Sequence, residues 1–229
     1  MILPNRRRRG VIFKSHHMQQ AIKPVATVLN ENYKKQLSTN EYQLILNPHE
    51  ELSDKIRLLR KGFAETYSVP AAPNAKPNLT LVRFTQLALM EERIVQRLRT
   101  IAMGFCPFKV ELKDFGSLPT HSIFINVTSK LPIRGLVKEV RDVQRLMKLD
   151  KEHKPHFIDE PNVLVARNLL PWQYEKAWLE FSNKHFTGRF VADAMLLLRR
   201  RTGDKNWQIA ERFAFQNLPV TTRQGELFG

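Results

Sequence analysis

From about residue 41 onward, the hydrophobic residues follow two patterns in turn: short apolar runs typical of strands, and apolar positions at helical spacing. YQLILN (42–47) is an apolar run of strand length. In the following segment, 47–67, four apolar residues recur at helical spacing: Ile56, Leu59, Phe63 and Tyr67. This spacing predicts a helix with one buried stripe. The Pro- and Ala-rich stretch SVPAAPNAKP cannot continue a helix, so we expect it to lead into a strand over 78–84.

The rest of the chain repeats this alternation. We predict helices over 88–103, 131–149 and 171–186, and strands over 108–115, 121–127, 162–168, 188–201 and 206–216. Residues 153–161 are predicted to be a loop. Trp172 and Trp178 of the last helix are interpreted as core and helix-packing residues, without a ligand. Helices mixed with tight strand connections favour an α+β protein with antiparallel sheets.

Composition limits the organisation and the partners of the chain. With 229 residues and 42% hydrophobic content, it is able to bury one core. We predict a basic N-terminal extension (1–40), a folded domain (41–216) and a C-terminal tail (217–229). The extension holds eight Lys or Arg against one acid, within a net charge of +15. Its RRRR run is either a solvated end or an arm that binds nucleic acid or a protein partner.

The sequence also shows features that exclude several classes of protein. A single Cys106 excludes an intramolecular disulfide, and no apolar run is long enough to span a bilayer, so we expect a cytoplasmic protein without a membrane role. His16 and His17 have no metal-ligand spacing with Cys106.

One phrase occurs twice in the chain. AKPNLTLVRF (75–84) is echoed by DEPNVLVARNL (159–169), and both read Pro-Asn, then an apolar strand, then Arg. Because side chains alternate along a strand, Asn78 and Thr80 share one side of the first copy, and Asn162 and Leu164 share one side of the second. If a pseudo-twofold axis relates the two halves, these residues face each other across a cleft. Strict alternation turns the two arginines to the opposite face.

The two copies resemble the paired motifs of the two-histidine (2H) phosphoesterases, which include bacterial 2'-5' RNA ligases and cyclic nucleotide phosphodiesterases. In that family the motif is His-x-Thr/Ser on each of two facing strands. KPNLTL (76–81) is similar to the first motif and EPNVLVAR (160–167) to the second. The likeness in element order covers about 41–216. It implies two pseudo-symmetric lobes of antiparallel sheet with outer helices around a central cleft. It also implies neither a metal nor another cofactor, because the family's chemistry does not need one.

The departure from the motif bears on catalysis. The resemblance implies that Asn78 and Asn162 replace the two proton-transferring histidines, that Thr80 keeps one phosphate-binding hydroxyl, and that Leu164 replaces the other. An amide has no pKa near neutrality, so neither Asn is able to accept or donate the proton. Each lost acid or base costs about two to four decades of rate. We therefore expect a catalytically impaired protein.

Two explanations of the twin replacement remain open: His-to-Asn inactivation to trap a ligand, and natural decay towards a binding protein. Leu164 favours decay, because trapping gives no reason to remove the hydroxyl. An alternative is an active phosphodiesterase or RNA ligase that uses other histidines, namely His121, His153 or His156. A further alternative is a structural or regulatory protein with a vestigial cleft.

The first hypothesis is that the cleft binds RNA or a small (cyclic) nucleotide phosphate. The candidate ligand-binding residues are the motif positions, the arginines that end the twin phrases, and the basic and aromatic residues around the last hairpin turn. They are Asn78, Thr80, Asn162, Arg83, Arg167, Arg199, Arg200, Arg201, Lys205 and Trp207.

Overall fold

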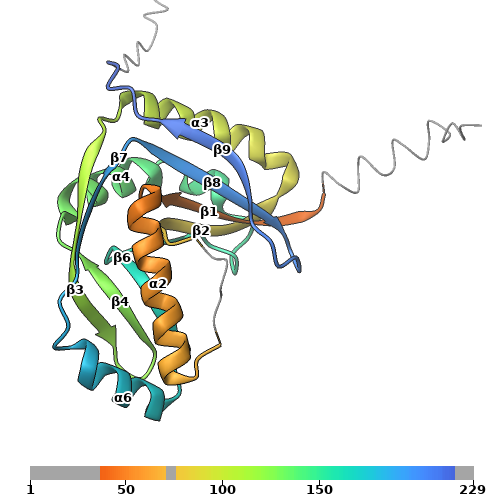
Figure 1. Cartoon of the computed structure of the whole chain (residues 1–229). Helices are drawn as coiled ribbons and strands as arrows, with labels where there is room; N and C mark the ends of the chain where they lie inside the picture. The colour runs from red at the N-terminus through yellow and green to blue at the C-terminus, as the bar shows by residue number, and fades with distance from the viewer. Residues whose placement is uncertain (1–36, 71–75, 220–229) are drawn as a thin grey trace, which may run out of the picture. The chain divides into compact units, whose positions relative to one another are not determined.

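The structure, a computed structural model, describes residues 37–70 and 76–219, all within the unit Gln36–Gly229. It contains two antiparallel sheets (Figure 1). The five-stranded sheet has the order β5 (His156–Phe157), β2 (Leu79–Leu87), β1 (Thr39–Leu46), β8 (Ala194–Arg201), β9 (Gln208–Ala214). The four-stranded sheet has the order β6 (Asn162–Arg167), β4 (Ser122–Val127), β3 (Phe108–Leu118), β7 (Thr187–Ala192). The predicted α+β class with antiparallel sheets is confirmed.

The helices cross between the sheets. The described helices are α2 (Glu50–Tyr67), η1 (Ala88–Met90) leading into α3 (Glu91–Gly104), α4 (Lys130–Arg141), α5 (Gln144–Met147) and α6 (Pro171–Phe181). Helix α2 follows β1 of the larger sheet but packs on β6 and β7 of the smaller one, beside α6. Helix α4 follows β4 of the smaller sheet but packs against α3, which lies on β9 of the larger sheet (Figure 1). Helix α5, which follows α4, packs on β2 of the larger sheet, so each sheet contacts a helix that follows a strand of the other.

A single hydrophobic core joins both sheets because of this exchange. The stripe predicted on α2 is confirmed, since Ile56, Phe63 and Tyr67 are buried and Leu59 packs against the core. The rings of Phe63 and Phe181 meet edge to face at 5.1 Å, which links α2 to α6. Burying both sheets in one apolar cluster makes the positions of their edge strands interdependent.

Several predicted boundaries are wrong. The segment 188–201 is two strands, because the chain breaks at Asp193 and passes from the smaller sheet (β7) to the larger (β8). The loop 153–161 contains the short strand β5. The helix over 131–149 is divided into α4 and α5, and α6 ends at Phe181.

One core assignment is also wrong. Trp172 is 52% exposed, whereas Trp178 is half-buried against the core. None of the described helices is long and apolar enough to cross a membrane. The basic run Arg6–Arg9, His16 and His17 lie outside the described residues, as does most of the predicted C-terminal tail.

Candidate functional site

The two repeated phrases form strands β2 and β6, which come from different sheets and approach each other with Cα atoms within 8 Å. Strand β6 is an edge strand, and β2 is covered on its outer side only at Val82 and Arg83, by β5. The two motif strands therefore lie where the two sheets meet.

Each motif strand carries a β-bulge at the same place in its motif. Ile45 pairs with Thr80 but Leu44 pairs with Val82, so Leu81 is the extra residue of β2. In the same way, Phe124 pairs with Leu164 but Ile123 pairs with Ala166, so Val165 is the extra residue of β6. In both strands the bulged residue follows the motif asparagine by three positions. The duplication thus extends from the sequence to the backbone.

The bulges overturn one expectation from the sequence. Residues paired directly across two strands point to the same face of the sheet. Arg83 pairs with Gln43, and Thr80 pairs with Ile45. Gln43 and Ile45 are two residues apart on β1, so they share a face. The extra residue therefore returns Arg83 to the face of Thr80, where strict alternation predicted the opposite face. The matching bulge returns Arg167 to the face of Leu164.

The two arginines influence each other electrostatically. Burial, and after it the positive charge of Arg167, lower the pKa of Arg83. Within the described residues, neither guanidinium has a carboxylate within 4.0 Å. Both residues are exposed, and two like charges near each other without a described counter-ion favour a bound anion, because an anion relieves the repulsion.

The motif asparagines have the same local contacts. Asn78 donates Nδ2–H to the carbonyl of Lys76 at 3.2 Å, and Asn162 donates Nδ2–H to the carbonyl of Glu160 at 3.1 Å. Thr80 donates its hydroxyl to Oδ1 of Asn78 at 3.3 Å. These bonds are exposed or half-buried and are long for hydrogen bonds, so ligand atoms are able to replace them.

A hollow of about 600 Å³ lies beside the second motif. Asn162 lines it together with its cross-strand partner Asn126, and Phe124 and Thr128 contribute an aromatic face and a hydroxyl. Glu160 also lines it but is neutralised by Lys130 and Arg134, each at 2.6 Å, which lower the pKa of its carboxyl. Nothing in the sequence connects Asn126 and Phe124 with the motif, because only the sheet register brings them to it.

Arg60 of α2 holds the second motif strand in place. Its Nε and Nη2 donate to the carbonyl of Leu164 at 2.9 and 2.5 Å, and burial lowers the pKa of Arg60 to about 10, so it is charged at neutral pH. This residue fixes the backbone between Asn162 and the bulge. Sequence reasoning missed it, because a lone Arg on a helix carries no signal of a contact 104 residues away.

The predicted basic cluster divides between two faces of β8. Arg199 binds Glu91 at 2.7 Å on the face that carries α3, next to Tyr42, whose hydroxyl donates to the same carboxylate. Arg200 faces the other way, binds Glu41 through Nε and Nη2, and lies over the ring of Trp207 at 4.6 Å. Strand alternation thus separates Arg199 from the candidate site.

Arg201 and Lys205 are exposed near the hairpin turn. A second hollow, of about 290 Å³, lies between this hairpin and residues 152–154, and Arg83 and Trp207 both line it. Of the predicted ligand-binding residues, the structure therefore brings Arg83 and Trp207 to one surface.

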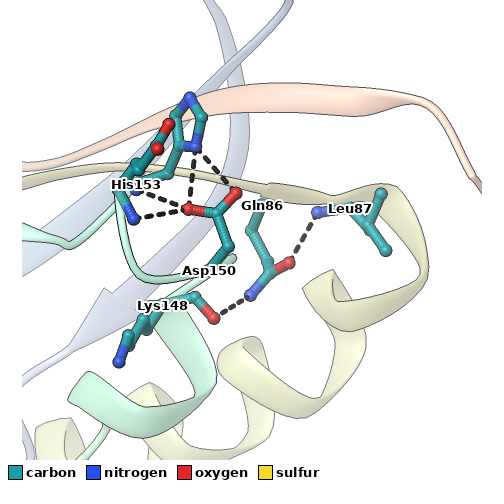
Figure 2. Close-up of polar contacts among 6 residues, drawn as sticks. Gln86, Leu87, Lys148, Asp150 and His153 are labelled. Carbon is teal, nitrogen blue, oxygen red and sulfur yellow. Dashed lines mark hydrogen bonds and ion pairs between the residues drawn. The ribbon is translucent and has the colours of Figure 1, made fainter.

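The three alternative histidines differ in their surroundings. His121 is exposed just before β4, and its backbone carbonyl accepts from Leu169. The His153 ring contacts the Asp150 carboxylate through Nδ1 at 2.8 Å, as Figure 2 shows. His156 of β5 pairs with Arg83 and so shares its sheet face. Within residues 37–70 and 76–219, no three His, Cys, Asp or Glu side chains form a group suited to a metal ion.

A family model described as the 2'-5' RNA ligase superfamily matches residues 48–204. The chain belongs to the 2'-5' RNA ligase superfamily, the 2H phosphoesterases, as its motifs suggested. None of the curated proteins matches it.

Solved structures agree on the fold. The chain is similar to E. coli LigT complexed with 3'-AMP, at 13% identity over 78% of this chain and 98% of that chain, with a TM-score of 0.54. LigT in apo form gives a TM-score of 0.55 at 13% identity, over 77% of this chain and 98% of that one. A crystal structure of a phosphoesterase gives 0.51, with the same identity and coverage as apo LigT.

Proposed function

We propose that this chain binds a nucleotide phosphate, free or within RNA, between its two motif strands and turns it over poorly or not at all. The observation that carries the proposal is the pair Arg83 and Arg167, which the matching bulges bring to the motif face without a described counter-ion. Guanidinium groups bind phosphate through two parallel N–H donors. Arg199 is left out of this site because Glu91 already binds it.

Three neutral side chains are proposed to complete the phosphate site. The amides of Asn78 and Asn162 and the hydroxyl of Thr80 donate hydrogen bonds to phosphate oxygens in exchange for their present weak contacts. E. coli LigT, which shares the fold, has been crystallised with 3'-AMP and with ATP, and this supports a nucleotide as ligand. The open hollow beside Asn162 supports a functional site over a vestigial one.

Poor turnover follows from the chemistry of the amide. Neither Asn78 nor Asn162 is able to take a proton from an attacking oxygen or give one to a leaving oxygen. The proposed protein is thus a binder that keeps the geometry of a phosphodiesterase without its acid and base.

The first test compares the native protein with the double variant Asn78→His, Asn162→His on a 2',3'-cyclic nucleotide and a 2'-5' linked dinucleotide. We expect turnover only in the variant, with a bell-shaped pH profile because one His must be neutral and the other protonated. The two single variants are the matched controls and should be almost inactive. Nucleotide binding by neither protein would refute the proposal.

The alternative, an active enzyme, is favoured by one observation: His156 shares the face of Arg83 across the β2–β5 ladder. It predicts that the native protein cleaves these substrates and that His156→Gln abolishes the cleavage. The variants His121→Gln and His153→Gln test the other two histidines. If the native protein cleaves the substrates and each of the three variants cleaves them equally well, none of these histidines is the catalytic group.

The charge of the chain leads to a second expectation. A polynucleotide bound through several Lys and Arg releases counter-ions, so its affinity should fall steeply with salt concentration. The exposed residues Arg201 and Lys205 near the hairpin turn are proposed to contribute to this salt-dependent part of the affinity without contacting the motif. Affinity independent of salt would remove RNA from the proposal and leave the small nucleotide.

A further inference from the structure

The hollow of about 290 Å³ lies on the face of the five-stranded sheet that carries Thr80 and Arg83, next to the motif along β2. Arg83 lines one part of it. Because Leu81 is bulged, Arg83 lies two ladder positions beyond Thr80, and thus ~7 Å further along the strand at ~3.3 Å per residue. Gln43 and Thr85 contribute neutral polar side chains from the same face of β1 and β2. We refer to this hollow as the β2 groove.

One wall of the β2 groove is the last hairpin. Trp207 is half-buried, and Arg200 lies over its ring at 4.6 Å, held there by Glu41. The indole is thus restrained, and the carboxylate of Glu41, which also lines the groove, is neutralised by Arg200. An aromatic side chain beside cationic groups is the usual platform for stacking a nucleic-acid base.

The opposite wall of the β2 groove is the segment that carries His153 and Lys154. Hydrogen bonds with Asp150 and Gln86 hold this segment and the residues before it in place. Asp150 accepts hydrogen bonds from the backbone N–H of Glu152 and of His153, at 2.8 and 2.7 Å. The buried Gln86 of β2 donates to the carbonyl of Leu146 and to the carbonyl of Lys148. Figure 2 shows the second of these bonds. The groove is therefore preformed, so a ligand need not order this wall.

We propose that the β2 groove is a base-binding subsite for a nucleotide adjacent to the phosphate held by the motif strands. The base stacks on Trp207, Gln43 and Thr85 give hydrogen bonds, and Arg83 lies between the two subsites. The ligand is then a single-stranded RNA segment of at least two nucleotides, not a mononucleotide. This inference depends on the proposed function, because the groove extends the motif site.

The experiment measures the affinity of the full chain for 3'-AMP, for the dinucleotide ApA with a 3'-phosphate, and for a six-residue oligoadenylate. Trp207→Ala is compared with Trp172→Ala, a control at the exposed tryptophan of α6. We expect Trp207→Ala to weaken dinucleotide and oligoadenylate binding about 5- to 150-fold, the range for one stacked base, and to leave 3'-AMP unchanged. Trp172→Ala should change none of the three.

A second variant keeps the test independent of the hairpin. Thr85→Trp places a large side chain in the groove and should likewise block the longer ligands while 3'-AMP still binds. Dinucleotide affinity no greater than that of 3'-AMP, or equal effects of Trp207→Ala and Trp172→Ala, would overturn the subsite and leave the proposed function standing. If the native protein binds none of the three ligands, the proposed function itself fails.

Discussion

Gly116 of β3 provides a sharp test of the site geometry. A Cβ built at this position would lie 2.4 Å from Oδ1 of Asn126 and 2.5 Å from Cε2 of Phe124. Both distances are well below van der Waals contact, and both neighbours line the hollow beside Asn162. The absence of a side chain at residue 116 therefore lets these two groups lie across β3. We predict that Gly116→Ala displaces them from their present positions.

The expected magnitude follows from the cost of overpacking. Forcing a methyl group into a filled space costs about 1–3 kcal/mol, which for a chain of this size lowers Tm by about 2–12 °C. Because Asn126 and Phe124 must move, affinity for 3'-AMP should fall as well. Calorimetric melting and titration calorimetry measure the two effects on the same sample.

Gly135 of α4 is the matched control. A Cβ there meets no atom within 4 Å, and Ala is favoured over Gly inside a helix by about 0.5–1 kcal/mol. Gly135→Ala should thus raise Tm by about 1–4 °C and leave affinity unchanged. If Gly116→Ala behaves like Gly135→Ala in both measurements, the described packing around Asn126 is incorrect.

Three further predictions concern the supports of the site. Arg60→Met should lower the free energy of unfolding by about 1.5–3 kcal/mol in urea titrations, because the Leu164 carbonyl loses a charged donor; an unchanged midpoint and slope would contradict this. Hydrogen bonds from the His153 backbone and ring lower the pKa of the Asp150 carboxyl. These bonds therefore stabilise the segment 152–154 fully above about pH 4, and this stabilisation is lost as the carboxyl protonates at lower pH. NMR shifts of the His153 amide should follow this titration, and Asp150→Asn should abolish it. Leu164→Thr in the His-restored protein should raise turnover by supplying the missing hydroxyl, and an unchanged rate would show that β6 does not contact the phosphate there.

Local sequence determined the elements and the chemistry of the motif. The helical stripe of Ile56, Phe63 and Tyr67 predicts α2 because neighbouring turns of a helix are close in sequence. The repeated Pro-Asn phrase predicts two matching strands, which β2 and β6 confirm, and the amide of Asn78 is not itself able to act as a general acid or base. These conclusions need no information about distant residues.

The tertiary structure decided what depends on pairing between distant segments. A bulge exists only relative to a partner strand, so alternation within 78–84 or 162–168 was unable to place Arg83 and Arg167. The break at Asp193 was hidden because β7 and β8 are both apolar strands whose difference lies in their partners, β3 and β1.

The same reason explains the residues that sequence reasoning missed. Arg60 reaches the motif because α2 crosses to the other sheet, and Asn126 faces Asn162 because of the β4–β6 register. Residue types and short spacings are properties of the chain, and they were enough to predict the family, which the family model confirms. Which cations share a face with that motif is a property of the packed sheets, because only the paired strands define a common surface.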